Sequence, residues 1–268
     1  MRNLFFAYVI AAAAVASTAR ASPADDCDAE SQDCAVVGKW NFSLALGAGV
    51  RTNPLVHGQD LPLVVVPQIS YYGKRFYLDD LDLGFTAVDG KTSSLSLIAS
   101  PGYDRIFFYR SDLQNIFVNV GGASGTRPFP SRSRSITYLA GPEWTFNDGG
   151  IIGQFDLLHE ITGHNHGDEV RGAIKIPVIR STGALSATVG LTWQSAAIVN
   201  YYYGAPGIYE SGSALRPFLK LGYTRPLGKG WRLEGIAQYE HLANAIADSP
   251  IVAHNHVVTS FLGFVRAF

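Results

Sequence analysis

VVTSFLGFVRAF, residues 257–268, ends the chain and decides its fold class. Alternate side chains of a strand point to opposite faces, and one face of this stretch carries Leu262, Phe264 and the C-terminal Phe268. Arg266 falls on the same apolar face, near enough to the end for its long side chain to reach lipid headgroups. An apolar outer face that ends in an aromatic residue is typical of the last strand of an outer-membrane β-barrel. We therefore expect Phe264 and Phe268 to lie in the strand that closes a barrel.

The clearest strand is WNFSLALGAGVR, residues 40–51, where apolar side chains alternate with small or polar ones. One face begins with Trp40 and Phe42, and the other with Asn41 and Ser43. A strand of a soluble β-sandwich is usually about five or six residues long, whereas a tilted membrane strand needs roughly nine to eleven. The length of this alternation therefore favours a membrane barrel over a soluble sandwich.

The same alternation recurs along the chain, and less regular stretches, interrupted by Pro62, Pro67 and Pro101, fill the gaps. The sequence predicts an all-β fold, an antiparallel up-and-down transmembrane β-barrel of about twelve strands, with ten as the alternative. The regular strands are expected at 136–146, 151–157, 170–178, 185–193, 215–223 and 231–239, and the less regular ones at 61–71, 75–88, 95–103 and 106–120.

Short and long connections alternate between these strands. Outer-membrane barrels have short periplasmic turns and long extracellular loops. This rhythm predicts a Gram-negative outer-membrane protein with both termini in the periplasm. The short turns are expected at 72–74, 147–150, 181–183 and 227–230, and the long loops at 52–60, 121–134, 161–167, 195–212 and 244–255.

Composition agrees with a barrel and excludes two other classes of protein. Charged residues make up only 16% of the chain, yet the mean hydropathy is a modest +0.10 and no long apolar run is present, which excludes a helical membrane protein. The formal net charge of −1 becomes more negative once Arg2 and Arg20 are removed with the signal described below. That balance gives no reason to expect a nucleic acid as partner.

The N-terminus has the pattern of a secretory signal peptide. Arg2 precedes the apolar stretch 4–16, which is too short to span a bilayer, and small residues at positions 19 and 21 form a cleavage motif. We predict a signal peptide over 1–21 with cleavage after Ala21. Residues 22–37 are then a periplasmic tail, and 38–268 form the barrel.

The predicted tail carries the chain's two cysteines, Cys27 and Cys34. In an exported protein a short-loop disulfide between them is the favoured interpretation. The chain has no C-x-x-C motif, so redox catalysis is not expected.

The face opposite the lipid carries charges of both signs. Mixed charges inside a barrel of this size predict a salt-bridged, hydrated interior rather than a wide pore. The residues concerned are Glu143, Asp156, Glu169, Arg171, Lys175, Arg216, Lys220, Arg232, Glu234 and Glu240.

Two His-x-His pairs, His164 with His166 and His254 with His256, lie in predicted extracellular loops. They are candidates for binding Zn²⁺ or Cu²⁺, with solvated rim histidines as the favoured alternative. The preceding His159 does not complete a zincin motif, because the spacing is one residue too long and glycines break the helix that it requires. We therefore predict no metal ion and no other cofactor.

Catalytic groups are not expected. His256 and Ser260 could form a lipid-hydrolase pair, but residues four apart on one strand are separated by roughly 13 Å. A loop pair of His159 and Asp168 is a weaker candidate for a protease. The sequence therefore predicts a protein that is not an enzyme.

Clustered tyrosines, Tyr201, Tyr202 and Tyr203 with Tyr209, fall in the longest predicted loop. Tyrosine supplies rigid, amphipathic contact area, so that these residues are candidates for contact with a partner or ligand. The alternative is an aromatic girdle at the membrane interface.

Several short sequence motifs resemble those of the MipA/OmpV family of MltA-interacting proteins. They are LPLV at 61–64, YYGKRFYL at 71–78, GLTW at 190–193, YYYG at 201–204, GIY at 207–209 and ADSPIV at 247–252, with Tyr239, Leu242, GF at 263–264 and the terminal Phe268. The resemblance covers nearly all of the mature chain, although 104–133 departs from the family's pattern.

The resemblance implies an outer-membrane barrel. It also implies, for some members, a scaffold that links a lytic transglycosylase to a murein synthase, and for others adhesion, osmotic response or antibiotic entry. We expect a monomer in outer-membrane lipid that acts as such a scaffold. The alternatives are a narrow channel for small solutes or antibiotics, an adhesin and, least favoured, a lipid hydrolase.

Overall fold

The computed structural model describes residues 21–22, 35–108, 134–181 and 183–268. Twelve strands form one closed antiparallel barrel, in which each strand pairs with its neighbours in sequence and the last pairs with the first. The strands are β3 (Trp40–Arg51), β4 (Leu61–Tyr72), β5 (Phe76–Asp79), β6 (Asp82–Asp89), β7 (Ser93–Pro101), β8 (Tyr138–Asp148), β9 (Ile151–Glu160), β10 (Asp168–Arg180), β11 (Ala184–Gln194), β12 (Ala214–Gly228), β13 (Trp231–His241) and β14 (His256–Ala267).

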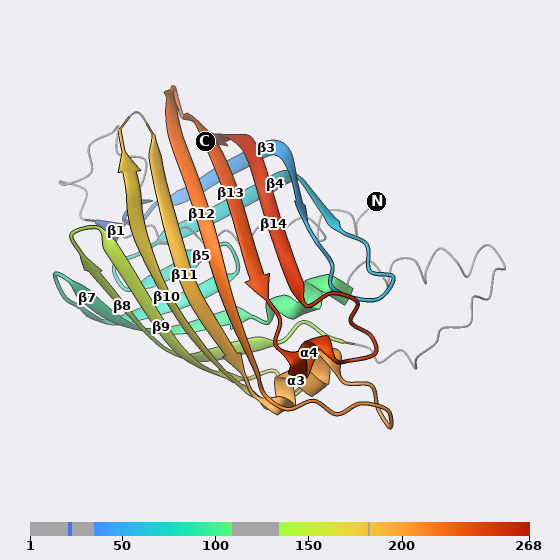
Figure 1. Ribbon diagram of the computed structural model, residues 1–268. Coiled ribbons are helices and arrows are strands. Elements are labelled where there is room, and N and C mark those ends of the chain that lie inside the picture. Colours follow the sequence, from blue (N-terminus) through green and yellow to red (C-terminus); the bar gives the residue numbers. More distant parts are fainter. Residues whose placement is uncertain (1–20, 23–34, 109–133, 182) are drawn as a thin grey trace, which may run out of the picture.

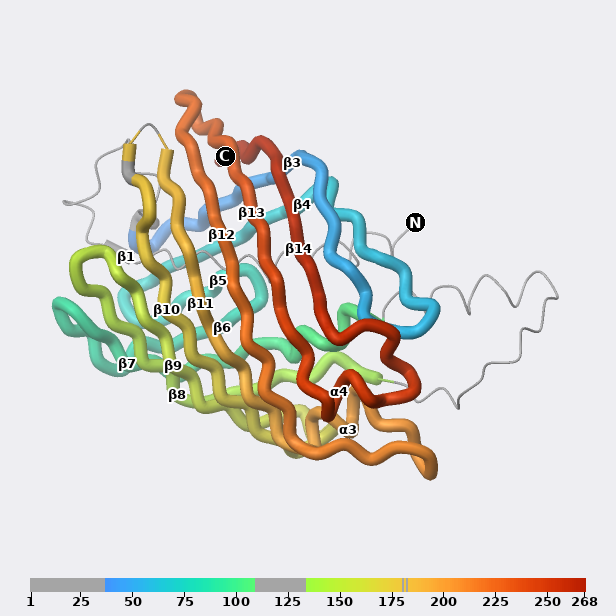
Figure 2. The backbone as a smooth tube through the Cα atoms, viewed as in Figure 1, coloured from blue at the N-terminus to red at the C-terminus, as the bar shows by residue number. Residues whose placement is uncertain are grey.

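The two ends of the barrel differ. Figure 1 and Figure 2 show the turn between β12 and β13 and the C-terminus at one end, and the helices α3 (Ala196–Tyr203) and α4 (Asn244–Ala247) at the other. Because consecutive strands are antiparallel, the tight turns at 73–75, 90–92, 149–150 and 229–230 all lie with the C-terminus, as do the end of β10 and the start of β11. We call this the short-turn end, and the opposite end the cap end.

The predicted fold and the number of strands are confirmed. The count agrees because one expected strand is two, whereas another expected strand is not seen among the described residues. The stretch 75–88 forms two strands rather than one, since the chain reverses at Asp80, which takes a left-handed φ of 51°. The Asp80 carboxylate and backbone N–H both bond to the backbone of Ile69 on β4. Residues 106–108 belong to a 3₁₀ helix, η2 (Tyr103–Phe108), rather than to a strand, and 109–120 lie outside the described residues.

Strand β4 is continuous despite its two prolines. It pairs with β5 only through Ser70–Tyr72, so among the described residues its earlier part has no strand on that side. The backbone of Ile69 faces this side, and so therefore does that of Pro67, two residues earlier. A proline on an edge costs no ladder hydrogen bond, which explains why Pro67 does not interrupt the strand.

The outer surface is an apolar belt, as the alternation predicts. Phe42, Leu46 and Leu191 are more than 40% exposed on it. Trp40, Trp144 and Trp231 add exposed indole rings toward the short-turn end, where an aromatic girdle belongs. Such a belt is the surface that a barrel presents to lipid.

Outside the barrel, β1 (Ala21–Ser22) and β2 (Ala35–Val36) form a two-stranded parallel sheet. Residues 1–20 of the predicted signal peptide (1–21) and the predicted Cys27–Cys34 disulfide fall outside the described residues, so both stay predictions. Within the described residues, no helix has the length and apolar character needed to cross a membrane.

Candidate functional site

The cap end of the barrel is filled by η2, α3 and α4, which we together call the cap. The first of these follows β7, the second follows β11 and the third follows β13, so three separate connections supply it. The ring of Phe108 lies 6.1 Å from that of Tyr202, and Tyr201 meets Tyr202 edge to face at 5.0 Å. The apolar and aromatic cap residues that are less than 9% exposed are Ile106, Phe107, Phe108, Ile198, Val199, Tyr201, Tyr202, Tyr203 and Ile246.

Directly inside the cap, Asp104 of η2 is the centre of a buried ion network. Its carboxylate accepts hydrogen bonds from Arg216 at 2.7 Å, Gln194 at 2.8 Å and Tyr203 at 2.9 Å. The guanidinium of Arg216 also donates to Glu240 at 2.8 Å. Burial raises the pKa of Asp104, but Arg216 and the hydrogen bonds from Gln194 and Tyr203 lower it more, so the pKa lies below its usual value.

Arg51 completes the network from the other side of the seam between β14 and β3. It lies 3.6 Å from Glu240, donates to the Thr259 hydroxyl at 2.9 Å, and stacks over the ring of Phe107. The positive charges of Arg51 and Arg216 therefore balance the negative charges of Asp104 and Glu240. All four residues are buried. This balance ties the cap to strands β3, β12 and β13.

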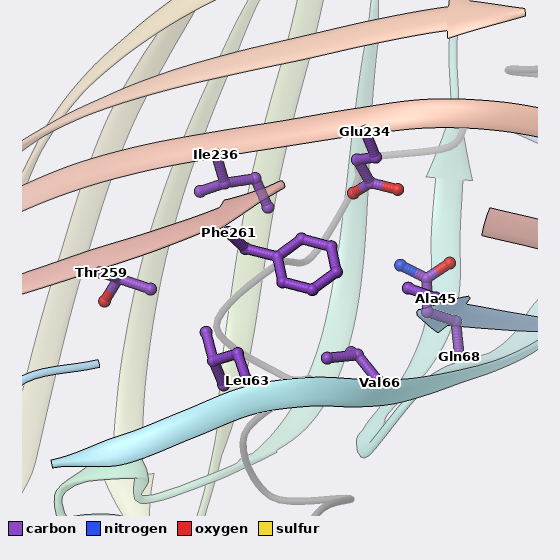
Figure 3. A pocket seen from close by; sticks show the side chains of 8 residues that line it. All are labelled: Ala45, Leu63, Val66, Gln68, Glu234, Ile236, Thr259 and Phe261. Carbon is purple, nitrogen blue, oxygen red and sulfur yellow. The ribbon is translucent and has the colours of Figure 1, made fainter. Parts of the chain in front are cut away.

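Toward the short-turn end, further ion pairs and hydrogen bonds line the lumen, in agreement with the predicted mixed charges. Arg171 donates to Glu169 at 2.5 Å, and Arg232 lies 3.5 Å from Glu234. Gln154 bridges Glu143 and Asp156. Figure 3 shows a pocket between β3, β4, β13 and β14, with the ring of Phe261 in the middle of its side chains; they are Ala45, Leu63, Val66, Gln68, Glu234, Ile236, Thr259 and Phe261.

The predicted tyrosine cluster lies on α3, inside the cap. Tyr201, Tyr202 and Tyr203 are at most 7% exposed, so they form neither a lipid-facing girdle nor a surface open to solvent. Tyr209 lies apart on the following loop and donates to the backbone of Ala245. Contact with a partner through these rings would require the cap to open, and it stays a prediction.

The predicted histidine pairs lie at the cap end. The ring of His164 stacks on Tyr201 at 6.2 Å, and His256 stacks on Tyr239 at 5.8 Å. His254 lies 6.0 Å from His256. Across the described residues, no three His, Cys, Asp or Glu side chains are grouped to hold a metal ion, so the two pairs do not form a joint site.

With this geometry in hand, the chain can be compared with known proteins. The family described as "MltA-interacting protein MipA" matches residues 46–268. The chain belongs to the MipA family. The MltA-interacting protein of Escherichia coli (strain K12) is 27% identical over 231 residues, covering 79% of this chain and 84% of the relative. The "putative outer membrane protein YiaT" of the same organism is 24% identical over 240 residues, covering 82% and 89%.

Among solved structures, a loop-deletion mutant of OmpT, an outer membrane protein of Vibrio cholerae, aligns with 86% of this chain and 99% of its own, at 8% identity and a TM-score of 0.34. The monoaromatic hydrocarbon channel CymD aligns at 10% identity and a TM-score of 0.33, covering 87% and 89%. These values are low, and the fold of this MipA-family chain rests on its own closed sheet.

The loop 161–167 of this MipA-family chain is organised by Glu160. The carboxylate accepts backbone N–H bonds from Thr162 at 2.7 Å, His164 at 3.1 Å, Asn165 at 3.2 Å and His166 at 3.0 Å. Four convergent donors make this residue the anchor that positions one of the histidine pairs.

Replacing Glu160 with glutamine should loosen this loop without opening the barrel. The amide has one acceptor oxygen where the carboxylate has two, so about 1–3 kcal/mol of local stability is lost. Hydrogen exchange at residues 162–166 should therefore accelerate at least about fivefold, and exchange within β9 should not change. Unchanged exchange in the loop would contradict the anchoring role.

Only one of the two candidate hydrolase pairs comes together in the fold. His256 bonds to Asn255 at 3.2 Å, not to Ser260. His159 and Asp168 do meet, with Nδ1 and Oδ1 2.7 Å apart, but both side chains are exposed and face each other across a strand pair. A cross-strand pair of this kind needs no catalytic role to explain it.

Asp104 and the helical cap are not predicted by the sequence. The aspartate lies in the stretch that departs from the family's pattern, and no local periodicity sets it apart. Glu240 and Arg216 were found as inward residues by alternation. Asp104, the second carboxylate that Arg216 binds, is brought to them only in the folded barrel.

Proposed function

We propose that this MipA-family barrel is an outer-membrane scaffold that binds a lytic transglycosylase, and that it carries out no catalysis itself. Family membership and the name of the relative, MltA-interacting protein, support the partner. The name of the YiaT relative supports the outer-membrane location. A murein synthase as a second partner belongs to the same proposal.

The closed cap is the observation that most favours a scaffold over a channel. Buried aromatic side chains and a balanced ion network occupy the barrel at one end. A solute could cross only if this packing were displaced. A scaffold, by contrast, needs a rigid barrel and an exposed surface.

The short-turn end offers that surface. If the short turns are periplasmic, as the alternation of short and long connections predicts, the rim of the barrel at the short-turn end faces the murein layer. Among the described residues its exposed acidic side chains are Asp89 and Asp148. Basic side chains outnumber them, so we infer that the partner docks through an acidic face. The exposed basic residues are Lys39, Lys74, Arg75, Lys91, Arg225 and Lys229.

Neutralising this rim should weaken binding of the transglycosylase. We expect the variant Lys74→Gln, Arg75→Gln, Arg225→Gln, Lys229→Gln to bind at least about tenfold more weakly at low salt, because charges at the rim of an interface steer association. Biolayer interferometry with the detergent-solubilised barrel and the purified enzyme measures this.

The matched control neutralises charge at the cap end, with Asp168→Asn and Glu210→Gln. This variant should bind as the unmodified protein does. Equal affinity for all three proteins would refute docking at the short-turn end, and no binding by the unmodified protein would refute the scaffold proposal.

A narrow channel is the second candidate, because the lumen inside the cap is lined with polar side chains. In planar bilayers the unmodified protein should show no discrete conductance steps if the cap stays in place. Regular steps with the unmodified protein would favour the channel.

A further inference from the structure

Lys175, Thr188, Lys220 and Gln238 form one row across four neighbouring strands. The register pairs Lys175 with Thr188, Thr188 with Lys220, and Lys220 with Gln238. Their large apolar neighbours in sequence are more than 40% exposed on the outer face; these are Ile174, Ile176, Val189, Leu219, Leu221 and Tyr239. Because side chains alternate along a strand, the row faces the lumen.

The polar side chains of the row have donor groups that bond to none of the described residues. The arginines of the lumen bond to carboxylates or amides, as Arg171 does to Glu169 and Arg232 to Gln68. No hydrogen bond or ion pair to a described residue is made by any of the four side chains of the row. Nor are their polar atoms buried away from solvent. With respect to the described residues, the row therefore presents donors to the lumen that have no acceptor on the protein.

The row also carries charge that is only partly compensated. Lys175 and Lys220 are two strands apart, about 10 Å between their Cα atoms, and their long side chains can converge above Thr188. The carboxylate that attracts Lys220, Glu234, is shared with Arg232, from which it lies 3.5 Å. Two ammonium groups so placed repel each other unless an anion lies between them.

We propose that this row is a lumenal binding site for an anion, a carboxylate or phosphate group of a small solute. The two lysines supply charge, and Thr188 and Gln238 supply neutral donors on either side of Lys220. Farther toward the cap on the same strands lie Gln194 and Arg216, in the buried network. The solute therefore enters from the short-turn end. The site goes beyond the proposed scaffold function and does not depend on a protein partner.

Lysine-selective NMR tests the site directly. The mature protein in micelles, with its lysines converted to ¹³C-dimethyl-lysines that keep their charge, is titrated with inorganic phosphate and, separately, with glutarate. The signals of Lys175 and Lys220 should shift and saturate together. Those of Lys74 and Lys229, on exposed turns, should not. Assignment comes from single Lys→Arg variants.

Variants then measure the contribution of each charge. Lys175→Gln or Lys220→Gln should weaken binding at least about tenfold, the equivalent of one charge-assisted contact. The matched control variants, Lys74→Gln and Lys229→Gln, should bind as the unmodified protein does. Lys175→Arg and Lys220→Arg should retain binding.

The outcomes separate the sources of the anion. Saturation with phosphate alone identifies a phosphate-bearing solute, and saturation with glutarate alone identifies a carboxylate. Saturation with both supports a site for either group. Shifts that do not saturate, or that are equal at the turn lysines, overturn the proposal. If a Gln variant fails to fold, the titration of the unmodified protein still decides.

Discussion

Replacing Arg216 with methionine is expected to lower the free energy of unfolding of the barrel by about 3–5 kcal/mol. The side chain is 5% exposed and contacts both Asp104 and Glu240. Its removal leaves two buried carboxylates with Arg51 as their remaining cation. Removing one partner of a buried ion network costs far more than the pair itself contributes, because the charges that remain are still buried. Denaturant titration of the barrel in lipid vesicles measures the change.

The same substitution should also loosen the cap. Asp104 belongs to η2, and Arg216 is the residue that links it to β12. We therefore expect Arg216→Met, unlike the unmodified protein, to produce conductance steps in planar bilayers.

Arg232→Met is the matched control. Arg232 pairs with Glu234 at 3.5 Å nearer the short-turn end, where its side chain is 21% exposed. Loss of an ion pair that reaches solvent should lower the free energy of unfolding by at most about 1 kcal/mol. This variant should produce no conductance steps in planar bilayers. Equal destabilisation by the two variants would show that the buried network does not hold the cap.

Replacing Gly47 with valine should prevent normal closure of the barrel. Gly47 of β3 faces Gly263 of β14 across the closing seam. A Cβ atom at Gly47 would lie 2.3 Å from the backbone oxygen of Leu262 and 2.5 Å from the Cα of Gly263, which the seam cannot accommodate. We expect a loss of at least about 3 kcal/mol, the upper range for overpacking. The yield of folded barrel, measured by refolding into vesicles, should fall with it.

Ala48→Val provides the comparison, because Ala48 is the next residue on the same strand and faces outward. Added methyl groups there meet lipid rather than backbone, and β-branched residues suit strands. Its yield should match that of the unmodified protein. Normal folding of Gly47→Val would mean that β3 and β14 do not approach as closely as the seam indicates.

Local periodicity explains why strands such as β3 and β14 were predicted closely. Lipid on one side and a lumen on the other impose a two-residue alternation on every membrane strand, and that alternation can be read without knowing the partner strand. Chain reversal at Asp80 had no such signal. It depends on bonds between Asp80 and Ile69 of the neighbouring strand.

The cap could not be predicted in the same way. The run that includes Tyr201 to Tyr203 was expected in a loop, at the membrane interface or in contact with a partner, because aromatic residues suit either setting. In the fold, η2 and α4 come from distant parts of the chain and bury these rings together with α3. Burial of this kind is a property of the assembled barrel end and not of the segment.

By itself, then, the sequence determined the membrane barrel, its strand rhythm, and the mixture of charges on its inner face, since all three follow from alternation and composition. Only the tertiary structure decided which charges pair, which end holds the cap, and which inward lysines bond to no described residue. Those outcomes depend on register and on contacts between strands far apart in the chain, which no local pattern encodes.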